Sequence, residues 1–183
     1  SYFKRKRWLW FNRQIKSIMK FSKKQIDRYS RQIILKKIGV LGQKKLLKSS
    51  VLIVGAGGLG SPVAIYLAAL GVGKIGIIDY DKVEISNLAR QIIFTNSDIK
   101  KKKSSTAIHK LKQINPSIKF KSFQNKLTSK NINLIANNFD LIVDDGMHSP
   151  SANLNLILSS IKYLKNRRSF LAKEEVKRGG LKP

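Results

Sequence analysis

Cysteine is absent from all 183 residues of the chain. Its absence excludes disulfide bonds, a zinc site built on thiolates, and thioester or persulfide chemistry on this chain. No apolar run approaches the roughly 20 residues that a membrane-spanning helix needs. We therefore expect one domain with a core of its own, no membrane partner and no zinc.

Acidic residues are scarce, because ten Asp and Glu stand against 37 Lys and Arg, for a formal net charge of +27. Such an excess favours an acidic partner: nucleic acid, an acidic protein or an anionic surface. The lysines are scattered rather than gathered on one motif, as on a solvated surface encoded by an AT-rich genome. Both interpretations stay open, and neither requires nucleic acid as a partner.

The first 24 residues contain nine basic residues and no acid, with Trp8 and Trp10 among them. A disordered basic tail, a targeting presequence, and translated upstream sequence with Met19 as the true start all fit this composition. We expect residues 1–24 to be a disordered basic extension, and Ser1–Ile18 within it to have no function.

The clearest pattern in the chain consists of two apolar strands separated by a glycine turn and a helix. The runs Val51–Val54 and Ile75–Ile78 predict buried parallel strands. Between them, Val63–Leu70 is apolar nearly all round and predicts a buried helix, capped by Ser61 and ended by Gly71.

The turn after the first of these strands has the spacing G-x-G-x-x-G, and Asp79 follows the second strand. Glycines let the backbone approach a phosphate, and the next helix offers it free N–H groups. An aspartate about 20 residues further on is placed to accept hydrogen bonds from ribose hydroxyls. The pattern predicts a bound nucleotide, with a tight packing turn as the alternative.

Further elements alternate along the chain and predict an α/β fold: a Rossmann-like, doubly wound, mainly parallel sheet with helices on both faces. Strands are expected over Ile118–Phe123 and Leu141–Val143. Helices are expected over three ranges: Gln25–Leu47, broken near Gly39 and Gly42; Ser97 or Asp98 to Ile114; and Thr128 to about Ala136.

A polar loop from Tyr80 to Gln91 follows the second strand, at the edge where open α/β sheets bind ligands. Asn87, Arg90 and Gln91 are its candidates for phosphate and ribose contacts, with an ordinary solvated loop as the alternative. Lys100–Lys103 fall at the predicted start of a helix, where they oppose its dipole. They form either a phosphate-binding cluster or a frayed, solvated turn.

Two further groups of charged residues have alternative interpretations. Asp144 and Asp145 follow an apolar strand and suit either Mg²⁺ or the N-terminus of a helix. Arg28 and Arg31 share a helix face, and by themselves they suggest a solvated, partly capping pair.

Together these motifs resemble those of the ThiF/MoeB-type adenylyltransferases, relatives of the ubiquitin-activating enzymes, most closely the molybdopterin-synthase type. The match covers roughly residues 24–146 and argues against a dehydrogenase. The matching pieces are RYSRQI at Arg28–Ile33, GAGGLGSP at Gly55–Pro62, GVG, IDYD, SNLARQ at Ser86–Gln91, Lys103, INP at Ile114–Pro116, and DLIVD at Asp140–Asp144.

The resemblance implies adenylylation, with ATP and Mg²⁺, of the C-terminal glycine of a ubiquitin-like sulfur-carrier protein in molybdopterin, thiamine or thiocarboxylate-tRNA pathways. The resemblance also implies that Arg31, Arg90 and Lys103 are the catalytic residues, and that Arg31 enters the neighbouring subunit's site in a homodimer. The implied nucleotide contacts are Gly55, Gly57, Gly58, Asp79, Asp81, Ser86, Asn87, Leu88, Ala89, Arg90 and Lys103.

Two departures from the family pattern bear on activity. Met147 stands where the family has its magnesium aspartate, so Asp144 and Asp145 are the remaining candidates. The family's second half, with its carrier-binding strands, is expected to be missing after the domain of residues 25–166 and a basic tail of residues 167–183. The alternative is a truncated or degenerate homologue that binds nucleotide or a partner without catalysis. We expect a plastid (chloroplast) or cytoplasmic protein.

Overall fold

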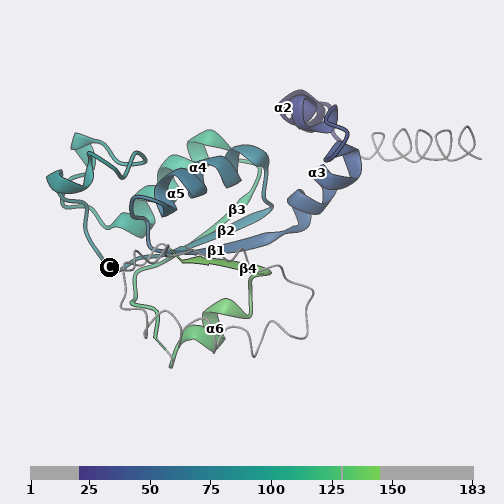
Figure 1. Cartoon of the computed structure of the whole chain (residues 1–183). Coiled ribbons are helices and arrows are strands. Elements are labelled where there is room, and N and C mark those ends of the chain that lie inside the picture. The colour runs from purple at the N-terminus through teal and green to yellow at the C-terminus, as the bar shows by residue number, and fades with distance from the viewer. Residues whose placement is uncertain (1–20, 129, 145–183) are drawn as a thin grey trace, which may run out of the picture.

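The computed structural model of the chain describes residues 21–128 and 130–144. The predicted extension up to residue 20, Asp145, Met147 and the predicted tail lie outside the described residues. Four parallel strands form one sheet in the order β3-β2-β1-β4 (Figure 1). They are β1 Ser50–Val54, β2 Lys74–Ile78, β3 Lys119–Phe123 and β4 Leu141–Asp144.

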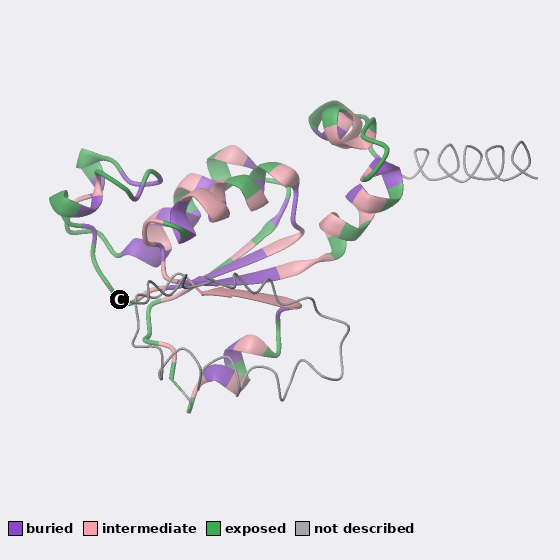
Figure 2. Cartoon of the chain, viewed as in Figure 1, coloured by how far each residue is buried: buried purple, intermediate pink, exposed green. Residues whose placement is uncertain are grey.

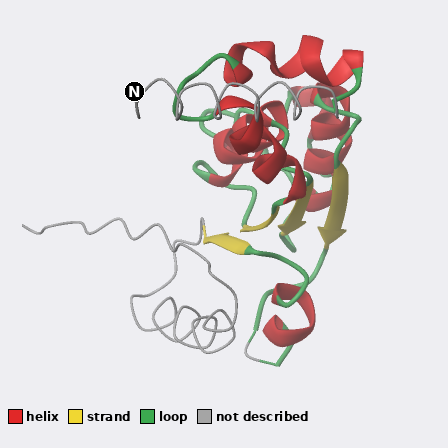
Figure 3. Cartoon of the chain, turned by 90° about the vertical axis from the view of Figure 1, so that its right-hand side faces the viewer, coloured by secondary structure: helices red, strands yellow, loops and turns green. Residues whose placement is uncertain are grey.

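Helices lie on both faces of this sheet, as predicted: α4 and α5 on one face and α6 on the other (Figures 1 and 3). Among the described residues, no helix is long and apolar enough to span a membrane. The elements are α2 Lys23–Ile33, α3 Gly39–Lys48, α4 Gly60–Leu70, α5 Lys103–Ile114 and α6 Ile132–Ala136, with short 3₁₀ helices η1 Ile85–Asn87 and η2 Asn96–Asp98.

The core consists of two apolar clusters, one on each face, because successive strand residues point to opposite sides. Ile53 and Ile77 belong to the cluster under α4 and α5, while Leu52 and Ile78 pack with Phe139 beside α6. Beyond their half-buried first residues, Ser50 and Lys74, the central strands β1 and β2 are buried (Figure 2). Burial of β1 and β2 places their carboxyl ends at one rigid edge.

Helix α4 is less buried than predicted. Ala64 and Ala68 face the core, but Tyr66 is 69% exposed, because α4 covers the sheet with one side only. Ser61 does not cap the helix; its buried hydroxyl donates to a carbonyl of the glycine turn at 3.1 Å. Gly71 does end the helix, in the left-handed conformation with φ of 80°.

The predicted helix over Gln25–Leu47 is two helices, and the break lies before Gly39 rather than after it. Helix α2 begins at Lys23 because Ser22 and Gln25 form a capping box. Gly39 starts α3 with φ of 58°, so its conformational freedom makes the turn into the helix.

Helices α5 and α6 both begin later than predicted. Helix α5 begins at Lys103, because Asp98 closes a 3₁₀ helix instead and Lys100 reverses the chain with φ of 69°. Three of the four clustered lysines therefore precede the helix. Helix α6 begins at Ile132, since Thr128 starts a turn rather than a helix.

Candidate nucleotide site

The glycine turn leaves β1 at the carboxyl edge of the sheet and is bound to the end of β2. Gly55 has φ of 90°, a conformation that favours glycine. Its N–H donates to the carbonyl of Ile78 at 2.8 Å. This bond holds the turn over the ends of both central strands, where open α/β sheets bind ligands.

Asp79 at the end of β2 is joined to this turn through its carboxylate. One carboxylate oxygen accepts the N–H of Ala56 and the other accepts the N–H of Asp81, each at 2.8 Å. The side chain is thus oriented by two backbone donors, and each oxygen retains a lone pair. The predicted ribose contact requires an acceptor in this place.

Arg90 packs directly against the glycine turn. A Cβ built on Gly58 would lie 3.5 Å from the Cδ of Arg90. The guanidinium is exposed and donates to the carbonyl of Ser86 at 3.1 Å. A positive charge therefore lies beside the backbone that the pattern assigns to a phosphate.

Asn87, Leu88, Ala89 and Gln91 shape the loop around this arginine. Asn87 is 7% exposed, and its side-chain oxygen accepts the N–H of Glu84 at 3.0 Å. Leu88 packs against the core and Ala89 is exposed. Gln91 is 2% exposed, so its side chain is buried within the loop.

Lys103 reaches the same edge from the first turn of α5. Its Nζ lies 3.3 Å from a carboxylate oxygen of Asp81, and its backbone N–H donates to the carbonyl of Asp81 at 2.9 Å. The lysine side chain is 8% exposed and that of Asp81 is 50% exposed. The pair compensates a buried positive charge.

Asp98 stabilises the loop that leads to Lys103. Its carboxylate accepts the N–H and the hydroxyl of Thr95 and pairs with Lys110 and Lys101. Burial raises the pKa of Asp98, but the bonds from Lys110 and Thr95 outweigh it and lower the pKa to about 2. Asp98 thus closes η2 instead of capping α5, a role that sequence reasoning missed when it offered Ser97 or Asp98 as the helix cap.

Asp144, the described member of the predicted magnesium pair, lies at the end of β4. It pairs in register with Val54, the last residue of β1, so it is one strand away from the glycine turn. Mg²⁺ commonly takes one or two carboxylates and completes its shell with phosphates and water. Asp144 fits as one such ligand, although the described residues contain no cluster of three His, Cys, Asp or Glu.

Helix α2 lies on the other side of the molecule, at the amino edge of the sheet (Figure 1). Arg28 donates to the carbonyl of Ile114 at 2.9 Å and so caps α5, which confirms the capping interpretation. Arg31 is exposed in the last turn of α2. The structure thus unites Arg90, Lys103 and Asp79 but not Arg31 within one chain.

Tyr29 is the residue of the RYSRQI motif that sequence reasoning missed. It is fully buried, and its hydroxyl accepts from the side-chain amide of Asn115 at 2.9 Å. The aromatic ring occupies the space next to Gly71. The motifs RYSRQI and INP therefore meet in two hydrogen bonds, this one and the bond from Arg28 to Ile114, which fasten α2 to the domain.

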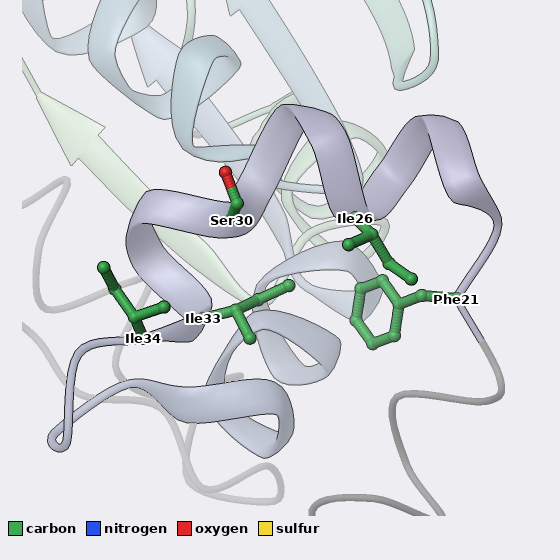
Figure 4. Close-up of a pocket in the computed structure, with 5 residues that line it drawn as sticks. All are labelled: Phe21, Ile26, Ser30, Ile33 and Ile34. Atoms are coloured by element: carbon green, nitrogen blue, oxygen red, sulfur yellow. The ribbon is translucent and has the colours of Figure 1, made fainter.

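A small apolar groove of about 150 Å³ runs along α2, far from the glycine turn (Figure 4). Its lining has no charged group, so it does not suit a nucleotide. The residues that line it are Phe21, Ile26, Ser30, Ile33 and Ile34.

The family assignment rests on this arrangement and on one sequence comparison. The model of the ThiF family matches residues 29–152, a span that includes every element of the site. The chain belongs to the ThiF family. The structure is thus the ThiF domain that the motifs predicted. Its parallel sheet carries the glycine turn, the SNLARQ loop and Lys103 at the carboxyl edge.

Two curated relatives and one solved structure show how far the likeness extends. The chain is 42% identical over 133 residues to a sulfur carrier protein adenylyltransferase from Thermus thermophilus, covering 73% of the chain and 49% of the relative. It is 48% identical over 124 residues to a probable molybdopterin-synthase adenylyltransferase from Porphyra purpurea, covering 68% of the chain and 32% of the relative.

A crystal structure of E. coli MccB with AMPCPP and MccA is similar in fold, with a TM-score of 0.65 and 30% identity. The alignment covers 78% of this chain and 42% of MccB. The chain thus spans half or less of the length of these relatives.

Proposed function

We propose that the chain adenylylates the C-terminal glycine of a small ubiquitin-like sulfur-carrier protein, with ATP as the donor. The observation that carries the proposal is the packing of Arg90 on Gly58, with Lys103 and Asp79 at the same edge. The similar proteins from Thermus thermophilus and Porphyra purpurea are named as adenylyltransferases, which supports the same chemistry.

The residues suit an attack by a carboxylate on an α-phosphate. Negative charge gathers on the phosphoryl oxygens in that step, and positioned cations stabilise it. Arg90 and Lys103 supply two positive charges there. Asp79 accepts from the ribose and fixes the nucleotide's orientation.

Lys103 needs a new partner to act on a phosphate. In the structure Asp81 holds its ammonium at the site edge. A triphosphate carries several negative charges against the single charge of the half-exposed carboxylate, so a bound triphosphate would draw the ammonium toward itself. Asp144 would hold Mg²⁺, which when bound neutralises charge on the phosphates.

A homodimer completes the proposed site. Arg31 lies outside the cluster of its own chain and is exposed. The neighbouring Ile34 and Leu35 are 70% and 51% exposed, an apolar surface of the kind that protein interfaces cover. We propose that this part of α2 packs on a second copy and delivers Arg31 to that copy's nucleotide.

The test is ATP–pyrophosphate exchange by the full chain with a panel of ubiquitin-like sulfur carriers from the molybdopterin, thiamine and tRNA pathways. Exchange is expected with Mg²⁺ and one carrier only. A folded sample that binds ATP but exchanges with none of them contradicts the proposal. That result favours the degenerate homologue, for which Met147→Asp is expected to restore exchange.

A further inference from the structure

A ribbon of lysines adjoins the nucleotide site and has no role in the proposed chemistry. The segment after β2 pairs antiparallel with the segment before α5, through a bridge between Lys82 and Lys102. Val83 forms two backbone bonds across the ribbon, donating to the carbonyl of Lys101 at 2.9 Å and accepting from the N–H of Lys100 at 2.8 Å. We call Lys82, Lys100, Lys101 and Lys102 the lysine ribbon.

The hydrogen-bonded backbone of the ribbon keeps its four positively charged side chains close together. All four lysines are exposed. Lys101 lies 3.6 Å from a carboxylate oxygen of Asp98, but among the described residues no ion pair involves Lys82, Lys100 or Lys102. Like charges on a paired, hydrogen-bonded backbone repel one another, so an anionic partner relieves a cost that the free protein carries.

The nearest acidic groups are already engaged. Asp81 pairs with Lys103, and Asp98 pairs with Lys101 and Lys110. Glu84 is exposed, and its side chain accepts the N–H of Asn87 in a capping box. The ribbon therefore presents a net positive surface to a partner.

We propose that the lysine ribbon docks an acidic face of the protein whose C-terminus enters the nucleotide site. The proposal deepens the proposed function and rests on it. Lys103 follows the ribbon directly and reaches the site edge, so the ribbon borders the place to which such a protein delivers its C-terminal carboxylate. Charge complementarity at such a rim guides encounter and orientation.

The composition of the ribbon favours a protein over a nucleic acid. Arginine forms the planar, bidentate contacts typical of phosphate recognition, and the ribbon contains only lysine. Among the described residues, Arg28 and Arg31 lie on α2 at the amino edge, and Arg90 packs on the glycine turn.

The experiment compares two triple variants of the full chain. The ribbon variant is K82E/K100E/K102E, and the control is K48E/K112E/K119E, whose three exposed lysines lie at the amino edge of the sheet. Each variant lowers the net charge by six, from +27 to +21, so general electrostatic attraction changes equally. A glutamine series at the ribbon positions provides a milder version if the glutamates impair folding.

The first readout is fluorescence anisotropy with a labelled polyglutamate peptide and a single-stranded RNA, each about 20 units long. The ribbon variant is expected to bind the peptide about tenfold more weakly than the control. Equal peptide binding by the two variants overturns the proposal. A loss confined to RNA also overturns it and makes the ribbon a nucleic-acid surface.

The second readout is the exchange reaction, with the carrier that supports exchange by the unaltered chain. The ribbon variant is expected to raise the KM for the carrier about tenfold, with kcat and the KM for ATP unchanged. An equal rise in the KM for ATP overturns the proposal, because the lysines would then serve the nucleotide. Failure of exchange by the unaltered chain contradicts only the proposed function, since the peptide comparison needs no catalysis.

Discussion

At the scale of single residues, the site depends on a few contacts that bring distant positions together. Arg90 packs on Gly58, Asp79 accepts from Ala56, and Lys103 pairs with Asp81. The residue types and their spacing were readable from the sequence, because each belongs to a short motif. The sequence did not reveal the burial of Gln91 or the Lys103–Asp81 pair, since both depend on how the loop after β2 folds back.

Lys103 is expected to contribute directly to the rate of the exchange reaction. Lys103→Ala removes a buried cation from the site edge and is expected to lower kcat for exchange by about a hundredfold or more. Lys112→Ala, an exposed lysine in the last turn of the same helix, is the control. Equal kcat values for the two variants would mean that Lys103 does not act on the phosphates.

The buried hydroxyl of Tyr29 is expected to contribute to the stability of the fold. Tyr29→Phe removes the hydroxyl that accepts from Asn115, whose amide still donates to the carbonyl of Ala68 at 2.8 Å. The free energy of unfolding, measured with urea, is expected to fall by about 1 kcal/mol. The exposed Tyr66 gives the matched variant Tyr66→Phe, which is expected to change it by less than about 0.5 kcal/mol. A loss as large at Tyr66 as at Tyr29 contradicts the buried bond.

At the scale of elements, the sequence predicted the strands better than the helix ends. Short, mostly β-branched apolar runs bounded by a turn, such as Val51–Val54, favour a strand that is buried on both faces of a parallel sheet, so their type and position are strongly constrained. Helix starts depend on which polar side chain closes which turn, and Asp98 or Thr128 serves a short turn as well as a helix. Helices α5 and α6 were therefore placed too early.

Asp98, in the loop before α5, makes the stability of the fold depend on pH. Its pKa of about 2 lies below the ordinary value of 3.8, so the ionised form stabilises the fold by about 2 kcal/mol. Because the folded pKa is the lower one, this stabilisation is complete above pH 4 and is lost as the pH falls toward 2. Urea unfolding at pH 7 and pH 2 is expected to show the loss in the native chain.

Asp98→Asn is expected to remove this pH-dependent part of the stability and to lower the free energy of unfolding at pH 7. Asp27→Asn, at an exposed position of α2, is its control and is expected to leave the pH dependence intact. If Asp98→Asn retains the whole acid-dependent loss, Asp98 is not its source.

At the scale of the whole molecule, the fold places charged residues at two opposite edges. The carboxyl edge holds Asp79, Arg90 and Lys103, and the amino edge holds α2 with Arg31. The sequence could predict the site of one chain, because its motifs follow strands. It could not show from periodicity that Arg31 lies apart from that site, since this depends on how α2 packs.

The separation of Arg31 from Lys103 predicts complementation between two inactive variants. Arg31→Ala and Lys103→Ala chains are each expected to be inactive in exchange, whereas a mixture recovers activity, because every mixed dimer contains one site with both residues intact. At random assortment the recovery is expected to be up to about a quarter of the unaltered activity. Monomers by light scattering, or a mixture as inactive as its components, would exclude a shared site.

The central claim is that the glycine turn, Arg90 and Lys103 bind the phosphates of ATP, and calorimetric titration tests it most directly. ATP and NADH are titrated separately into the full chain, into Arg90→Ala, and into the control Lys48→Ala. We predict that ATP binds more tightly than NADH and that Arg90→Ala alone weakens ATP binding about tenfold or more. Tighter binding of NADH, or unchanged ATP binding by Arg90→Ala, would contradict the account.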